Sequence, residues 1–165
     1  MERFWELVLA ASRFLDRLAG WLLAAVMFLV VANVVMRGAF KLPVFGAYEY
    51  VGLLTALVIA FSLARCEAQN GHIEISFLAE RWPPGVRAAV AVLAGAAGFG
   101  FWAVASWYVL SYARTLAQKG QVTSTAQLPS WLFVAAVAAG LLLYSLVILA
   151  KTAAAAAELV RGSKR

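Results

Sequence analysis

The residues that could carry out chemistry are few, and several of them lie in one polar stretch. The single cysteine, Cys66, and the single histidine, His72, belong to the segment CEAQNGHIEISFLAERWPPG at residues 66–85. One cysteine cannot form an internal disulfide or a CxxC redox pair, and one histidine cannot supply both axial ligands of a b-type haem or a His-rich metal cluster. No histidine is then left as a base for a serine such as Ser106. We therefore expect no catalytic, substrate-binding or metal-binding residue, and no cofactor.

Glu49 is the only acidic residue within one of the long apolar stretches. An ionisable side chain inside a membrane is a functional candidate by default. Because Glu49 lies at the beginning of its stretch, its carboxylate can reach the water among the lipid headgroups. We therefore expect it to make a surface or partner contact and not to couple transport to protons or ions.

Asn33 and Arg37 lie near the end of the first apolar stretch. An amide at this depth is expected to bond to an adjacent helix or to backbone and not to a ligand. Arg37 follows four residues later, so it shares the same helical face and is expected to project into the headgroups.

These side chains must be positioned by membrane-spanning helices. Apolar residues make up 64% of the 165 positions and charged residues only 13%, against roughly a quarter in soluble domains. A hydrocarbon core of about 30 Å requires roughly 20 apolar residues in a helix. The sequence predicts an all-α membrane protein with a single membrane domain over residues 1–165 and four transmembrane helices. The predicted spans are 18–36, 47–64, 88–113 and 130–150.

Two amphipathic helices are predicted beside these spans, at residues 1–17 and 72–82, and residues 151–165 form a tail. In the first helix an apolar stripe runs through Phe4, Leu7, Ala11, Phe14 or Leu15, and Leu18. The second helix follows the turn signal Asn70-Gly71 and precedes Pro83-Pro84, and such helices lie in the membrane interface. The residues expected to fix the chain at the interface are Trp21, His72, Phe77, Trp82 and Trp131.

The lysines and arginines predict the orientation. Ten of them flank one side of the spans and four the other, and the side with more basic residues faces the cytoplasm. Both termini and the 72–82 helix are therefore expected inside the cell. The ten are Arg3, Arg13, Arg17, Arg65, Arg81, Arg87, Lys151, Arg161, Lys164 and Arg165; the four are Arg37, Lys41, Arg114 and Lys119.

Small residues in the third span and polar residues in the outer connections indicate surfaces for other proteins. The glycines of the third span allow a second helix to approach closely, and the outer connections at 37–47 and 118–130 offer side chains for weak polar docking. The residues expected to contact a partner are Asn33, Arg37, Lys41, Glu49, Gly95, Gly98, Lys119, Gln121 and Thr123.

Four short motifs occur along the chain in a distinctive order: ANVVMR at 32–37, YEY at 48–50, GHIEI at 71–75 and GQVTSTAQLPSW at 120–131. Together they resemble the small membrane subunit, the DctQ type, of tripartite ATP-independent periplasmic (TRAP) transporters, and the likeness extends from about Asn33 to Trp131. The resemblance implies a non-enzymatic subunit of the bacterial inner membrane. Its implied partners are a large multi-span subunit, which uses a sodium gradient to take up an organic acid by an elevator-type motion, and a periplasmic substrate-binding protein.

Membrane lipids are further expected partners, and nucleic acid is not. Two other classes remain as alternatives. A small four-helix membrane enzyme of the glutathione-using MAPEG type would use Arg65, Arg81 and Arg87 to hold an anionic cofactor, but the tyrosines lie mainly toward the other side. A small multidrug exporter needs a carboxylate deep in a span, and Glu49 lies too near the edge.

Overall fold

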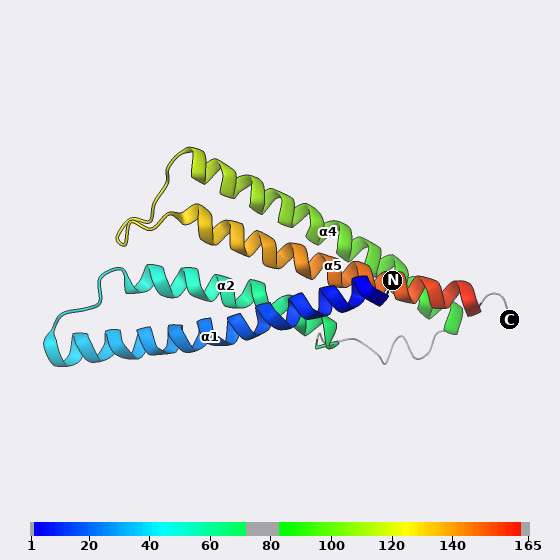
Figure 1. Ribbon diagram of the computed structural model, residues 1–165, viewed down its shortest axis with the longest axis horizontal. Helices are drawn as coiled ribbons and strands as arrows, with labels where there is room; N and C mark the ends of the chain where they lie inside the picture. The colour runs from blue at the N-terminus through cyan, green and yellow to red at the C-terminus, as the bar shows by residue number, and fades with distance from the viewer. Residues whose placement is uncertain (1, 72–82, 163–165) are drawn as a thin grey trace.

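The computed structural model describes residues 2–71 and 83–162 and consists of long helices joined by short connections (Figure 1). The helices in these two ranges are α1 (Glu2–Phe40), α2 (Ala47–Ala68), α4 (Pro84–Gln118) and α5 (Ser130–Gly162). All four are long and apolar enough to cross a membrane. The predicted all-α fold with four helices of membrane-spanning length is therefore confirmed. The helix predicted at 72–82, with His72, Phe77 and Trp82, lies outside the described residues.

Helix α1 is longer than its predicted span. It runs for 39 residues, from Glu2 to Phe40, and so unites the predicted amphipathic helix at 1–17 with the span at 18–36. No proline or other strong helix breaker separates the two segments. At a rise of 1.5 Å per residue the helix is about 58 Å long, roughly twice the thickness of a hydrocarbon core.

Backbone signals determine where the other helices begin and end. Helices α2 and α5 begin at the predicted residues, directly after Gly46 and Pro129. Pro84 lies in the first turn of α4, where the missing N–H of a proline costs nothing. Helix α2 ends at Ala68, and two residues later Asn70 takes a left-handed φ of 55°. The Gly71 N–H then bonds back to the Cys66 carbonyl in the last helical turn. The predicted turn at Asn70-Gly71 is confirmed.

The helices form an open layer rather than a closed bundle (Figure 1). Helix α1 packs on α2, α2 on α5 and α5 on α4, with a smaller contact between α1 and α5. Successive helices run in opposite directions, so the beginning of α1 and the end of α5 lie at one end of the layer, termed the terminal end. The connections 41–46 and 119–129 lie at the opposite end, termed the loop end. Helix α4 is at the edge of the layer and has only α5 as a major neighbour.

Small residues allow the central helices to approach each other closely. A Cβ atom at Gly140 of α5 would lie 2.7 Å from the backbone oxygen of Ala60 in α2. Between α4 and α5, a Cβ at Gly95 would overlap the hydroxyl oxygen of Thr152. The Ser106 hydroxyl of α4 also donates a hydrogen bond to the Ala138 carbonyl of α5 at 2.9 Å. Neighbouring helices are thus in contact through backbone and short side chains, as in other membrane helix pairs.

The buried face of α1 differs from the apolar stripe expected near its beginning. Val8, Ser12 and Ala19 are the buried residues, with 5%, 0% and 3% of their surface exposed. They point to α2 and α5, and Val8 joins the cluster around Val147. Leu7 and Phe14, which belong to the expected stripe, are 70% and 67% exposed. The stripe was expected to face the membrane interface or a partner, and it lies beside the face that α1 buries within the chain.

Candidate functional site

Among the described residues, a network of polar contacts lies at the loop end, and Glu49 is at its centre. Glu49 lies in the first turn of α2. Its Oε1 accepts a hydrogen bond from the Thr125 N–H at 2.7 Å, and its Oε2 accepts one from the Ala126 N–H at 2.7 Å. Both oxygens of the carboxylate therefore bind the α4–α5 connection. Charge-assisted bonds of this kind are stronger than bonds between neutral groups, so Glu49 joins the two halves of the chain.

Gly46 makes this junction possible. It precedes α2 with a φ of 71°, a left-handed conformation that favours glycine. A Cβ atom at this position would also lie 2.9 Å from the Ala126 Cβ. The two connections at the loop end therefore touch at Gly46 and Ala126, beside the hydrogen bonds of Glu49.

The α4–α5 connection is a compact turn held by its own hydrogen bonds. The Thr123 N–H donates to the Leu128 carbonyl at 2.9 Å, and the Leu128 N–H donates to the Thr123 hydroxyl at 3.1 Å. Val122 and Pro129 form a short antiparallel bridge below them. Thr123, which was expected to contact a partner, thus uses its hydroxyl oxygen within the turn, while the side chain of Gln121 is exposed.

Asn33 plays a similar part in the other connection. Its side-chain oxygen accepts a hydrogen bond from the Val44 N–H at 2.9 Å. The expectation that this amide bonds to backbone is confirmed. The bond fixes the short segment between α1 and α2, in which Lys41 takes a left-handed φ of 58°.

A groove of about 160 Å³ lies between α1 and α2 beside Asn33. Its lining is apolar over most of its length, and Asn33 and Arg37 add polar groups toward the loop end. In the part of the chain that the structure describes, the Arg37 guanidinium makes no hydrogen bond or ion pair. The lining residues are Val30, Asn33, Val34, Arg37, Ala47, Tyr48 and Val51.

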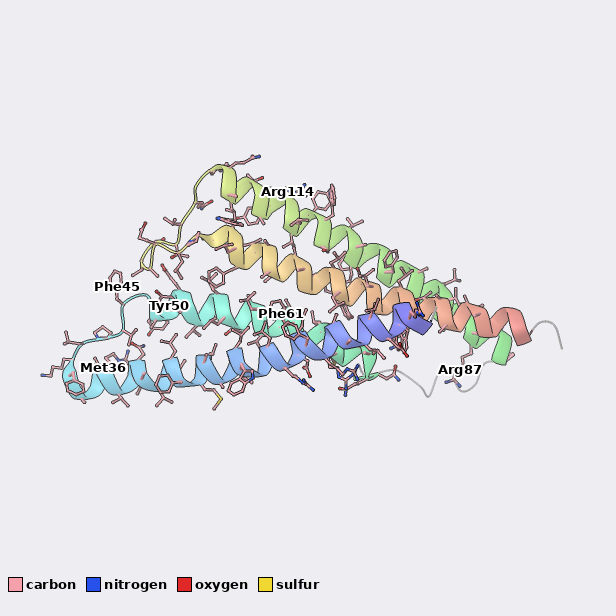
Figure 2. All side chains as sticks on the ribbon, viewed as in Figure 1. Met36, Phe45, Tyr50, Phe61, Arg87 and Arg114 are labelled. Atoms are coloured by element: carbon pink, nitrogen blue, oxygen red, sulfur yellow. The ribbon has the colours of Figure 1, made fainter. Side chains whose placement is uncertain are left out.

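Other basic residues are distributed over both ends of the layer. Figure 2 shows Arg114 at the loop end of α4 and Arg87 near its opposite end. The Arg114 guanidinium lies 5.8 Å from the centre of the Trp107 ring, a cation–π distance. Lys41 and Lys119 are exposed at the loop end, so this end presents cationic side chains on both connections.

Gly95 and Gly98, which were expected to meet a partner, face α5 of the same chain. Besides the contact of Gly95 with Thr152, a Cβ at Gly98 would lie 3.8 Å from the Ile148 side chain. A Cβ at Gly100, by contrast, would meet no atom within 4 Å. The helix that approaches the Gly95 face is therefore α5.

The terminal end contains an ion pair that the sequence analysis did not identify. The Lys151 ammonium of α5 donates hydrogen bonds to the Glu67 carboxylate and, at 3.0 Å, to the Glu67 carbonyl of α2. The side chains of Lys151 and Glu67 are 29% and 17% exposed. Cys66 beside them is half-buried. A basic residue near the end of one span and an acidic residue near the end of another were the only signals for this pair.

The polar side chains at the loop end hold the two connections in place. Among residues 2–71 and 83–162, no group of three or more His, Cys, Asp or Glu side chains could hold a metal ion. The polar residues that the loop end brings together, Asn33, Glu49 and Thr123, all bind backbone groups. The two tryptophans expected as interfacial residues within these ranges, Trp21 and Trp131, are 77% and 38% exposed.

One family model matches the chain. Residues 26–158 match the DctQ component of tripartite ATP-independent periplasmic transporters. The match covers the four helices from the middle of α1 to the last turns of α5. No curated protein matches the chain.

Proposed function

The chain belongs to the DctQ component family of TRAP transporters, and from this premise we propose that it is the small subunit that scaffolds the large transport subunit during sodium-driven uptake of an organic acid. It resides in the bacterial inner membrane with both termini in the cytoplasm, so the loop end faces the periplasm. The large subunit carries the substrate and the sodium ions. This chain supplies a fixed surface beside it.

The observation that carries this proposal is the uncovered side of α4. Helix α4 packs on α5 through Trp102, Ser106 and Ala113, of which Ser106 and Ala113 are buried. The opposite side, termed the free face of α4, is apolar from end to end at helical spacing. Its residues are Val86, Val90, Leu93, Ala97, Phe101, Val104, Tyr108 and Tyr112.

A layer open on this side suits a subunit that must lie flat against another. A closed bundle would bury its small residues internally, whereas the free face of α4 presents Ala97, and Gly100 beside it, without a neighbour within the described chain. Small residues on exposed membrane helices favour association with other helices. We place the large subunit on this face.

Tryptophan substitutions test this placement. Ala97→Trp would insert a large side chain between α4 and its partner. If only lipid covered this face, the acyl chains would rearrange around the tryptophan. We expect the variant to reach the membrane but to lose the large subunit on affinity purification. Ala25→Trp, at an exposed position of α1, is the matched control and should keep the large subunit. Equal recovery of the large subunit with both variants would contradict the placement.

The state of Glu49 favours a scaffold over a small exporter. An exporter that uses a carboxylate to bind protons or substrates needs that group free within the span. Both oxygens of Glu49 bind backbone N–H groups instead. The MAPEG-type alternative gains no support from the tyrosines, since Tyr48, Tyr50, Tyr108 and Tyr112 lie in the loop-end halves of α2 and α4, whereas Arg65 and Arg87 lie at the opposite ends of these helices.

Docking of the periplasmic binding protein is assigned to the loop end. Lys41, Lys119 and Gln121 are exposed there, and weak contacts between complementary charges suit a partner that must bind and leave. The double variant Lys41→Glu/Lys119→Glu should raise the binding-protein concentration needed for half-maximal uptake. The Arg87→Glu variant at the other end should leave that concentration unchanged. An unchanged concentration for the double variant would overturn this assignment.

A further inference from the structure

We propose that the groove between α1 and α2 at the loop end binds one anionic phospholipid. The groove has a volume of about 160 Å³ and is graded in polarity along the helix axes. Val30 and Val51 lie farther from the loop end, Asn33 and Val34 follow along α1, and Arg37 lies nearest the loop end. A phospholipid has the same gradation, from acyl chains through glycerol to phosphate.

The charge of the groove selects the headgroup. The Arg37 guanidinium has no ion pair or hydrogen bond within residues 2–71 and 83–162, and a planar guanidinium binds phosphate oxygens in pairs. The side-chain oxygen of Asn33 is used by Val44 at 2.9 Å, which leaves the amide nitrogen as a second donor. The exposed hydroxyl of Tyr48 at the rim is a third.

The groove lining contains no carboxylate that could accept the ammonium group of a zwitterionic lipid. The only acid nearby on α2 is Glu49, and both of its oxygens bind the α4–α5 connection. An anionic headgroup such as that of phosphatidylglycerol therefore matches the site better than choline or ethanolamine does. Acyl chains leaving the groove can lie along α1, where Met27 and Val31 are 63% and 61% exposed.

Native mass spectrometry of the complex of this chain with its large subunit tests the proposal. The complex is delipidated and titrated with phosphatidylglycerol, phosphatidylcholine or inorganic phosphate. We expect one tightly retained phosphatidylglycerol, weaker retention of phosphatidylcholine and no effect of inorganic phosphate. Arg37→Gln should weaken retention roughly tenfold or more, since a charged hydrogen-bonding group is lost, and Arg37→Lys should weaken it less. Arg114→Gln, at the other arginine of the loop end, should not change it.

A steric variant keeps the test independent of charge. Val34→Trp fills the groove and should abolish retention while Arg37 is still present. Val35→Trp, exposed on α1 next to Val34 but outside the groove lining, should retain the lipid. Retention by Arg37→Gln or by Val34→Trp equal to that of the unmodified complex would overturn the proposal. So would equal retention of phosphatidylcholine and phosphatidylglycerol, or competition by inorganic phosphate alone.

Discussion

The carboxylate of Glu49 lies 2.7 Å from the backbone nitrogen of Ala126, a residue 77 positions later in the chain. This contact connects the α1–α2 half of the layer with the α4–α5 half at the loop end. The halves also meet through the α2–α5 contact in the middle and through Glu67 and Lys151 at the terminal end. Separate contacts along the layer thus fix the angle between the halves, as a scaffold requires.

Substitution of Glu49 should loosen the α4–α5 connection without unfolding the helices. In Glu49→Ala both hydrogen bonds, to Thr125 and Ala126, are lost. In Glu49→Gln the neutral amide keeps one acceptor oxygen, and an NH2 group takes the place of the other. We expect faster cleavage of the connection at 119–129 by an added protease, with Glu49→Ala cleaved faster than Glu49→Gln. Glu6→Gln, at an exposed acidic residue of α1, is the control. Cleavage of all three variants at the unmodified rate would show that Glu49 does not hold this turn.

Alanine substitutions at three glycines should lower the stability of the chain to different degrees. Gly46→Ala introduces both a left-handed alanine at φ 71° and a Cβ 2.9 Å from Ala126, whereas Gly120→Ala introduces only the left-handed alanine at φ 59°. Left-handed backbone costs a non-glycine residue about 1–2 kcal/mol. Gly38→Ala, with nothing within 4 Å, lies in α1 and should be neutral or stabilising. In thermal unfolding of the purified chain, the midpoint should fall most for Gly46→Ala, less for Gly120→Ala and least for Gly38→Ala. Any other order would contradict the geometry.

Alanine at Gly140 should be more harmful than alanine at Gly95. At Gly140 the new Cβ meets the backbone oxygen of Ala60 at 2.7 Å, whereas at Gly95 it meets a side chain, that of Thr152. Overpacking of this kind costs about 1–3 kcal/mol. Thr152→Ala should partly rescue Gly95→Ala because it removes the hydroxyl. Ala60→Gly should not rescue Gly140→Ala, since the backbone oxygen remains, and full rescue there would be inconsistent with the structure.

The Lys151–Glu67 pair should show energetic coupling between α5 and α2. Both side chains are largely buried, at 29% and 17% exposure. In Lys151→Met the Glu67 carboxylate therefore loses the ammonium group that it pairs with. We expect each single variant, Lys151→Met and Glu67→Gln, to lower the free energy of unfolding. The double variant should lower it by less than the sum of the two single effects. A coupling free energy of about 0.5–3 kcal/mol is typical of residues in contact. Strict additivity of the two losses would argue against the pair.

The sequence predicted an all-α fold with four helices of membrane-spanning length, because hydrophobic length is a local signal. Asn70-Gly71 was recognised as a turn, and α2 and α5 begin at the residues predicted for them. The length of α1 was underestimated, because Arg13, Asp16 and Arg17 suggested a separate interfacial segment. A helix does not have to end where the hydrocarbon does.

The neighbours of each residue could not be predicted in the same way. Gly95 and Gly98 have the composition of an association surface, but composition does not say whether the second helix belongs to the same chain. Glu49 was recognised as unusual from its place in a span, yet its partners are backbone N–H groups of a distant turn. Backbone donors carry no sequence signature, so a site built on them becomes visible only in three dimensions.

Uptake by reconstituted vesicles tests the central claim most directly. Vesicles are prepared with the large subunit and this chain, with the large subunit alone, or with this chain alone, each supplied with the periplasmic binding protein, its organic acid and an inward sodium gradient. The account predicts uptake only when both membrane subunits are present, and Ala97→Trp in this chain should reduce it. Full uptake by the large subunit alone, or any sodium-driven uptake by this chain alone, would contradict the assignment of this protein as a scaffold without a transport site.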